Sequence, residues 1–188
     1  MVGSTLTAFA IAALITGGDL TLTSARPRHL DSLLEILKDT GAAISVEDDS
    51  MRIAANGVAK AADITTDPYP GFPTDLQAQF MALMCLAEGP SRISETVFEN
   101  RFMHVPELMR MGADIRVDGG VAIVKGQKTL TPAPVMATDL RASVSLVLAA
   151  LATEGTSEVS RIYHLDRGYS DLEAKLGACG ARMKRVGD

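Results

Sequence analysis

DLRASVSLVLAALATEG, residues 139–155, decides the fold, because two other stretches of the chain have the same alanine-rich, apolar composition. These are TLTAFAIAALIT at 5–16 and DLQAQFMALMCLAEG at 75–89. Each is an alanine-rich apolar run of helical length, and a repeated run of this kind indicates a repeated structural unit. A glycine, which accepts the left-handed conformation found at many helix ends, closes each run. The three glycines are Gly18, Gly89 and Gly155.

The same succession of elements follows each predicted helix. A short stretch with alternating apolar residues comes first and predicts a strand with one buried face. These stretches are 20–22, 92–94 and 158–160. A second helix is expected next, and in the first copy leucines at helical spacing over 30–37 give it one apolar stripe. Each second helix ends in Gly-Ala, at nearly the same distance from the first glycine in all three copies.

Two hairpins complete the pattern. Residues 115–117 and 121–124 flank Gly119-Gly120, a typical hairpin turn, and the first copy has the equivalent strands at 44–46 and 51–53. We therefore expect one α/β domain over 1–188, with repeats at about 4–66, 67–130 and 131–188. The third copy stops before its second hairpin strand, so we expect its last repeat to be incomplete.

Composition limits the functional classes. Hydrophobic residues make up 47% and charged residues 22% of the 188 residues, which excludes a disordered chain. The net charge of −5 argues against a nucleic-acid partner. The longest apolar run, Ala8 to Ile15, is too short to span a membrane, and no basic residue precedes it as in a signal peptide. Two cysteines and no cluster of metal ligands fit a reducing cytoplasm, so no metal or cofactor is expected.

Asp75 is the first candidate for chemistry, since it stands at the start of a predicted helix. One interpretation is structural, because an acidic residue there caps the helix and favours its dipole. The other is that Asp75 accepts a proton or a hydrogen bond from a substrate hydroxyl. Local sequence leaves both open.

Asp139 and Arg141 stand at the equivalent place in the third copy. Asp139 is suited to cap the helix. Arg141 is unusual there, because a cation is disfavoured at the positive end of a helix. Either it pairs with a nearby acid, or it joins the helix N–H groups in binding a carboxylate or phosphate.

Three polar loops at equivalent places form the last candidate. They cover 25–29, 99–104 and 164–169, and each contains a basic residue. They are either ordinary surface loops or parts of one convergent positive patch. A lone histidine in such a loop is more often structural than functional. Cys85 lies mid-helix between apolar residues and is expected in the core, and Cys179 has no local basic partner to lower the pKa of its thiol, so neither is expected to be a nucleophile.

Four strings resemble the UDP-N-acetylglucosamine 1-carboxyvinyltransferase family of enolpyruvyl transferases. The resemblance runs from about Ala8 to Val186. The strings are PGFPTDLQAQFMALMCLAEG, SETVFENRFMHVPELMRMGADI, VMATDLRASVSLVLAALATEG and RIYHLDRGYSDLEAKLGACGA. The resemblance implies an inside-out α/β barrel of three βαβαββ units, corresponding to the C-terminal domain of a two-domain family. In that family the N-terminal stretch of the chain completes this same domain before the chain crosses to the other domain.

The resemblance also implies a reaction and a set of site residues. Enolpyruvyl moves from phosphoenolpyruvate to the 3′-hydroxyl of UDP-N-acetylglucosamine through a tetrahedral intermediate, and phosphate leaves. Asp75 matches the aspartate proposed as the base for that hydroxyl. The other matching positions are Val97 and Phe98 at the nucleotide-sugar site, Arg101 supporting the cleft, Asp139 at the active site, and Arg141 and Arg167 on the phosphoenolpyruvate carboxylate.

Some residues of the family pattern have no counterpart in this sequence. They are a lysine–asparagine pair near the N-terminus, the loop cysteine that reacts with phosphoenolpyruvate, and the loop arginine that binds phosphate. We therefore expect the chain alone to be inactive and to require the missing domain or a second chain. The alternatives are a non-catalytic module that binds a nucleotide sugar or docks a partner, and a related transferase with another acceptor.

Overall fold

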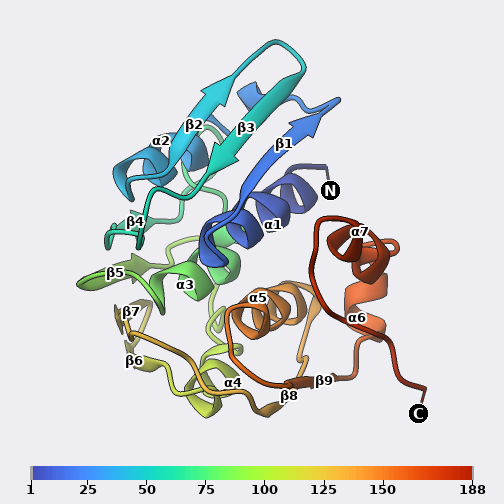
Figure 1. The fold of residues 1–188 in the computed structure, drawn as a ribbon. Helices are drawn as coiled ribbons and strands as arrows, with labels where there is room; N and C mark the ends of the chain where they lie inside the picture. Colours follow the sequence, from blue (N-terminus) through green and yellow to red (C-terminus); the bar gives the residue numbers. More distant parts are fainter. Residues whose placement is uncertain (1, 188) are drawn as a thin grey trace.

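Three apolar helices form the centre of the molecule in the computed structural model, which describes residues 2–187. They are α1 (Val2–Ile15), α3 (Gln77–Met84) and α5 (Leu140–Leu151), and each packs against the other two (Figure 1). All eight residues of α3 are buried, as is the stretch of α5 from Ala142 to Ala149. A helix that is apolar on every side is stable only when neighbours cover it all round. The three helices expected from the sequence are confirmed.

The glycines at the ends of these helices differ from the prediction in detail. Gly17, with φ of 72°, takes the left-handed conformation just after α1, whereas Gly18 does not, so the assignment of the cap to Gly18 was wrong. Gly89 and Gly155 have positive φ but stand several residues beyond the last turns of α3 and α5. They reverse the chain ahead of the next strand rather than close the helix.

Three separate sheets lie outside the central helices (Figure 1). The first is antiparallel, in the order β1 (Asp19–Thr23), β3 (Ser50–Ala54), β2 (Ala43–Val46). The second has the order β4 (Ile64–Thr65), β5 (Pro90–Ser94), β7 (Val121–Lys125), β6 (Asp114–Asp118). The third pairs β8 (Pro134–Met136) with β9 (Glu158–Ser160) in parallel. Both predicted hairpins are present, as β2–β3 and β6–β7.

The remaining helices are short and lie on the outside. α2 (Asp31–Asp39) buries the predicted leucine stripe through Leu33, Leu34 and Leu37. The others are α4 (Val105–Arg110), α6 (Tyr163–Asp166), α7 (Leu172–Ala178) and the 3-10 turns η1 (Pro27–His29) and η2 (Thr74–Leu76).

The architecture is therefore α/β with helices inside and sheets outside. β4 and β5 are parallel and joined through α3, and β8 and β9 are joined in the same way through α5. The second repeat was predicted to begin at about residue 67, but β4, which lies before that residue, belongs to the second sheet. Over residues 2–187 the three sheets do not join into a closed barrel. No helix in this range is long and apolar enough to cross a membrane.

Candidate functional site

The first turns of two central helices bring Asp75 and Arg141 together. Asp75 lies in η2, just before α3, and Arg141 lies in the first turn of α5. The Arg141 Nε and Nη2 atoms are 2.6 Å and 2.5 Å from Asp75 Oδ1. Arg101 approaches the same oxygen, with its Nη1 at 3.9 Å. The Asp75 side chain is 51% exposed, so the pair adds little to stability but remains accessible to a ligand.

The two aspartates at equivalent places have different roles. Asp139 caps α5, since its Oδ1 accepts hydrogen bonds from the backbone N–H groups of Arg141 and Ala142 at 2.7 Å and 3.0 Å. Asp75 makes no capping bond; its carboxylate faces the arginines instead. The structural interpretation therefore holds for Asp139 but not for Asp75. Of the two interpretations of Arg141, the structure shows pairing with an acid.

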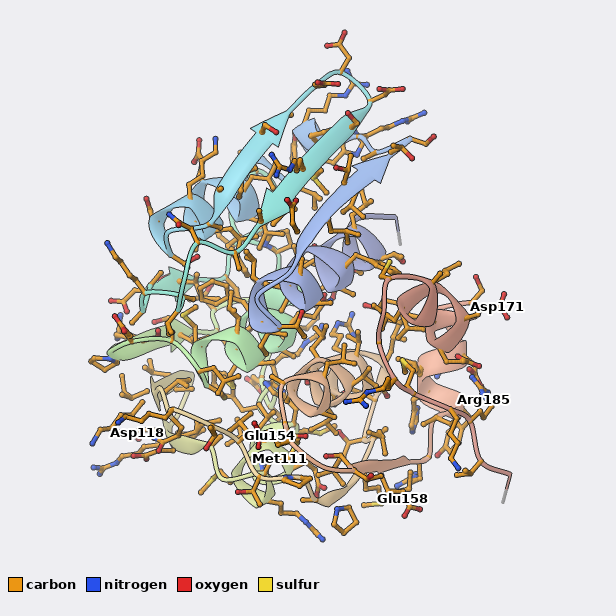
Figure 2. The ribbon with its side chains drawn as sticks, in the orientation of Figure 1. Met111, Asp118, Glu154, Glu158, Asp171 and Arg185 are labelled. Carbon is orange, nitrogen blue, oxygen red and sulfur yellow. The ribbon has the colours of Figure 1, made fainter. Side chains whose placement is uncertain are left out.

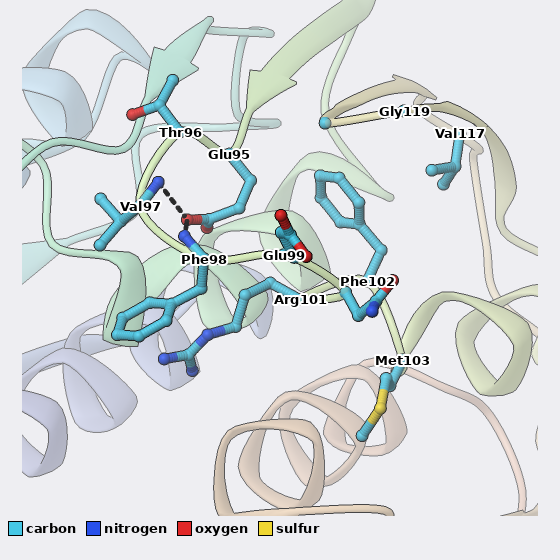
Figure 3. A pocket seen from close by; sticks show the side chains of 12 residues that line it. Glu95, Thr96, Val97, Phe98, Glu99, Arg101, Phe102, Met103, Val117 and Gly119 are labelled. Atoms are coloured by element: carbon cyan, nitrogen blue, oxygen red, sulfur yellow. Dashed lines mark hydrogen bonds between the residues drawn. The ribbon is translucent and has the colours of Figure 1, made fainter.

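The loop that follows β5 forms the second side of the site. Phe98 is half-exposed, and the Arg101 guanidinium stacks on its ring, 4.2 Å from the centroid (Figure 3). Such a stack holds the guanidinium in one orientation while leaving its outer N–H groups free to bind. A cavity of about 750 Å³ runs along this loop, and Val97, Phe98 and Arg101 are among its lining residues. The opposite wall is the β6–β7 turn, with Val117, Gly119 and Gly120.

Glu95 at the base of this loop was missed in the sequence. It is 8% exposed, and its carboxylate accepts hydrogen bonds from the backbone N–H groups of Val97 and Phe98 at 3.0 Å and 3.1 Å (Figure 3). The hydroxyls of Thr66 and Thr74 also donate to it. The available signal was an acidic residue directly after a predicted strand, where a side chain can turn back on the chain.

Tyr169 lies behind the site, among the central helices. Its hydroxyl accepts a hydrogen bond from Gln79 Nε2 at 3.3 Å and donates to the Ser4 carbonyl at 3.4 Å. Burial and the nearby Asp75 charge raise the pKa of Tyr169 well above its usual value. The phenol is therefore protonated at neutral pH and acts as a structural hydrogen-bonding group.

Arg167 is exposed at the end of α6, and a β-carbon on the next residue, Gly168, would lie 2.9 Å from the side chain of Leu140 at the start of α5. Among residues 2–187 it enters no hydrogen bond or ion pair that would fix its side chain. Its neighbour Asp166 is fixed, because Arg185 binds it through two hydrogen bonds of 2.9 Å and 2.7 Å. Arg185 also binds Glu173 Oε1 at 3.0 Å, and Figure 2 shows it beside α6. Of the three loops expected to converge, 99–104 contributes Arg101, which meets Arg141 at Asp75, whereas convergence of loops 25–29 and 164–169 with them stays a prediction.

The Arg185 cluster leads to a pH prediction. Hydrogen bonding by Arg185 lowers the pKa of Asp166. The pKa of Glu173 is lowered mainly by a hydrogen bond from its own backbone N–H, and to a smaller extent by Arg185. A lowered pKa in the folded state adds stability above the ordinary values of 3.8 and 4.5, and this stability is lost as pH falls through the lowered values. We expect the thermal midpoint of Arg185→Gln to lie below that of the wild type at about pH 6, with the difference shrinking toward pH 3. A difference independent of pH would contradict this assignment.

The surroundings of His104 and Cys85 agree with the expectations for these two residues. His104 is fully buried, with its Nε2 3.2 Å from the Met81 sulfur, and burial lowers its pKa to about 4. Burial raises the pKa of Cys85 to about 12, so that thiol is not a nucleophile at neutral pH. Neither group faces the Asp75–Arg141 pair through a hydrogen bond.

The site therefore combines two guanidinium groups, one accessible carboxylate and an adjoining cavity. The positive groups suit a small anion such as a carboxylate or phosphate. The carboxylate suits a hydroxyl group, from which it can accept a hydrogen bond or a proton.

Solved structures with a similar fold define the class of protein. The enolpyruvyl transferase NikO from Streptomyces tendae matches with a TM-score of 0.88 and 29% identity, over 97% of this chain and 44% of that one. An EPSP synthase from Acinetobacter baumannii matches with a TM-score of 0.80 over 98% of this chain and 46% of that one. At 18% identity this second likeness shows the fold alone. The chain has an enolpyruvyl transferase type of α/β fold.

The family follows from the sequence. The family model described as EPSP synthase (3-phosphoshikimate 1-carboxyvinyltransferase) matches residues 4–176, and the chain belongs to this family. The UDP-N-acetylglucosamine 1-carboxyvinyltransferase of Methylorubrum populi is 60% identical over 179 residues, and the enzyme of that name from Caulobacter sp. is also 60% identical. The resemblance seen in the sequence is thus confirmed. The chain spans 42% and 41% of the length of these two relatives.

Proposed function

We propose that this chain forms one part of the active site of a transferase that moves enolpyruvyl from phosphoenolpyruvate to the 3′-hydroxyl of UDP-N-acetylglucosamine, in cytoplasmic peptidoglycan synthesis. The observation that carries the proposal is the convergence of Asp75, Arg101 and Arg141 beside the Val97–Phe98 loop. The 60% identity to enzymes with this name supports the choice of substrates. The inside-out barrel of three βαβαββ units, with its third unit completed by chain outside this sequence, is proposed as the architecture.

Each site residue has a role that its environment supports. Asp75 accepts the hydrogen bond, and then the proton, of the sugar hydroxyl, because its carboxylate is exposed and can be reached by that group. Arg141 binds the phosphoenolpyruvate carboxylate together with Arg167, and Asp139 orients it by capping α5. Val97 and Phe98 line the nucleotide-sugar site, and Arg101 supports the cleft by stacking on Phe98.

The reaction needs more positive charge than these residues supply. Phosphoenolpyruvate carries a carboxylate and a phosphate, and its addition step develops further charge that an enzyme must stabilise. We propose that the other domain of the protein, or a second chain, supplies the remaining groups. The chain alone should then bind the nucleotide sugar without releasing phosphate from phosphoenolpyruvate.

Calorimetric titration of the chain with UDP-N-acetylglucosamine tests the proposal. The wild-type chain should release or absorb binding heat, and Asp75→Ala should weaken binding at least about tenfold. The reason is that the sugar hydroxyl loses a charged acceptor, and such a hydrogen bond is worth roughly 1.5–3 kcal/mol. Absence of binding to the wild-type chain would overturn the proposed binding function of this chain.

Two controls sharpen the titration. Asp75→Asn has the same shape but lacks the charge, so its affinity should fall between those of the wild type and Asp75→Ala. Asp114→Ala removes an exposed aspartate in β6, away from the ion pair, and should bind as the wild type does. Equal affinities for Asp75→Ala and Asp114→Ala would remove Asp75 from the site.

A further inference from the structure

Glu95 connects three segments that carry the candidate site. Its Oε1 accepts hydrogen bonds from the Thr66 hydroxyl at 2.9 Å and from the backbone N–H groups of Val97 and Phe98 at 3.0 Å and 3.1 Å. Its Oε2 accepts one from the Thr74 hydroxyl at 2.8 Å. Thr66 follows β4, Thr74 begins η2, and Val97 and Phe98 belong to the loop after β5. One carboxylate thus joins segments that are otherwise distant in the sequence.

The burial of this carboxylate explains why the connection is firm. Thr66 is fully buried and Glu95 nearly so, and a carboxylate removed from water is stable only when donors surround it. All four of its donors are neutral. Thr66 is itself fixed on both sides, because Thr96 N–H donates to its hydroxyl at 2.9 Å and the Thr96 hydroxyl donates to its carbonyl at 2.5 Å. The loop after β5 is therefore fixed to β4 at several points.

The two outer ends of this network are the two sides of the site. Thr74 is the residue before Asp75, so the bond to Oε2 fixes the turn that presents that carboxylate to Arg141. The N–H groups of Val97 and Phe98 fix the loop on which the Phe98–Arg101 stack is built. Figure 3 shows the Glu95 carboxylate under the loop, with Phe98 and Arg101 beyond it.

We infer that Glu95 is a positioning residue for nucleotide-sugar binding: although it borders the cavity, its carboxylate is occupied by four protein donors, and through them it sets the distance between the Val97–Phe98 loop and Asp75. The inference rests on the proposed function, since it concerns the same site. It adds that one buried acid keeps the Val97–Phe98 loop and the turn with Asp75 at the distance that binding needs.

Replacement by glutamine separates positioning from charge. In Glu95→Gln the amide oxygen can accept the bonds now made to Oε1, and the amide nitrogen can donate to the Thr74 hydroxyl. In Glu95→Ala the N–H groups of Val97 and Phe98 lose their acceptor, and the loop is released. We expect Glu95→Ala to weaken binding of UDP-N-acetylglucosamine at least about tenfold, and Glu95→Gln to remain within about threefold of the wild type.

Thr74→Val tests the link to Asp75 alone. Valine has the shape of threonine but cannot donate to Oε2, so the loop stays fixed while η2 is released. Affinity should fall by roughly threefold to tenfold, and Thr74→Ser should restore it. All titrations are made well below each variant's thermal midpoint, so that lower stability by itself does not reduce binding. Glu154→Ala, at an exposed glutamate after α5, is the matched control.

Each result decides the matter. Weak binding by Glu95→Ala with near-normal binding by Glu95→Gln supports positioning. Equal weakening by both would show that the charge itself is needed, and this would overturn the inference while leaving the proposed function intact. Wild-type affinity in a folded Glu95→Ala would also overturn the inference and leave the proposed function intact. Absence of binding by the wild type would overturn the proposed function and the inference together.

Discussion

Gly126→Ala is expected to destabilise the chain by about 3 kcal/mol, at the upper end of the cost of overpacking. Gly126 follows β7, and a β-carbon placed on it would lie 1.7 Å from the Ala87 carbonyl oxygen and 2.8 Å from its carbon. Two backbones would have to separate to admit the methyl group. This would break the hydrogen bond from Gln127 N–H to the Cys85 carbonyl, which is 2.8 Å long. Urea unfolding of the variant should show the change as a lower midpoint with little change in slope.

A second glycine provides the matched control. Gly177 lies in α7, and a β-carbon there would meet no atom within 4 Å. Since alanine favours a helix over glycine by about 1 kcal/mol, Gly177→Ala should leave stability unchanged or raise it. If Gly126→Ala unfolds at the wild-type midpoint, the close approach between β7 and the segment after α3 is incorrect.

Phe80→Ala is expected to cost about 3–5 kcal/mol, the range measured for deletion of a fully buried phenylalanine. Phe80 has no exposed surface and lies in α3, the helix that packs against both α1 and α5. Its ring meets that of Phe72 edge to face, with centroids 5.7 Å apart. Alanine would leave a cavity at the point where the central helices meet, and rigid neighbours on all sides could close it only in part. The free energy of unfolding in urea measures the loss.

The same substitution at Phe98 is the comparison. Phe98 is 52% exposed in the loop after β5, so Phe98→Ala should cost less than about 1 kcal/mol. Phe80→Leu, which retains most of the buried volume, should cost less than about 1.5 kcal/mol. Similar losses for Phe80→Ala and Phe98→Ala would mean that α3 is not the centre of the core.

The elements were predictable because they depend on local pattern. Mostly apolar, alanine-rich runs marked the central helices, alternation marked the strands, and Gly119-Gly120 marked the β6–β7 turn. The contacts of Glu95 and Gly126 were not predictable in this way. Glu95 bonds to Thr66 and Thr74, which lie 29 and 21 residues away. Only the packing of β4, β5 and η2 around one point brings these groups together.

Identical tripeptides show where prediction from local sequence ends. Thr74-Asp75-Leu76 and Thr138-Asp139-Leu140 both lead into a central helix, and the sequence alone determined that much. In the second, Asp139 has extended backbone angles, φ −157° and ψ 178°, and its side chain caps α5. In the first, the tripeptide forms a 3-10 turn whose threonine is bound to Glu95.

Tertiary structure therefore determines the different partners of the Asp75 and Asp139 side chains. The turn at η2 leaves Asp75 without a capping bond and directs its carboxylate to Arg141, 66 residues away. Local sequence sets which residues are helical, because burial of apolar faces and helix ends depends on near neighbours. The partner of a charged side chain depends on which distant segments the folded core brings within a few ångströms, and a one-dimensional pattern does not contain that distance.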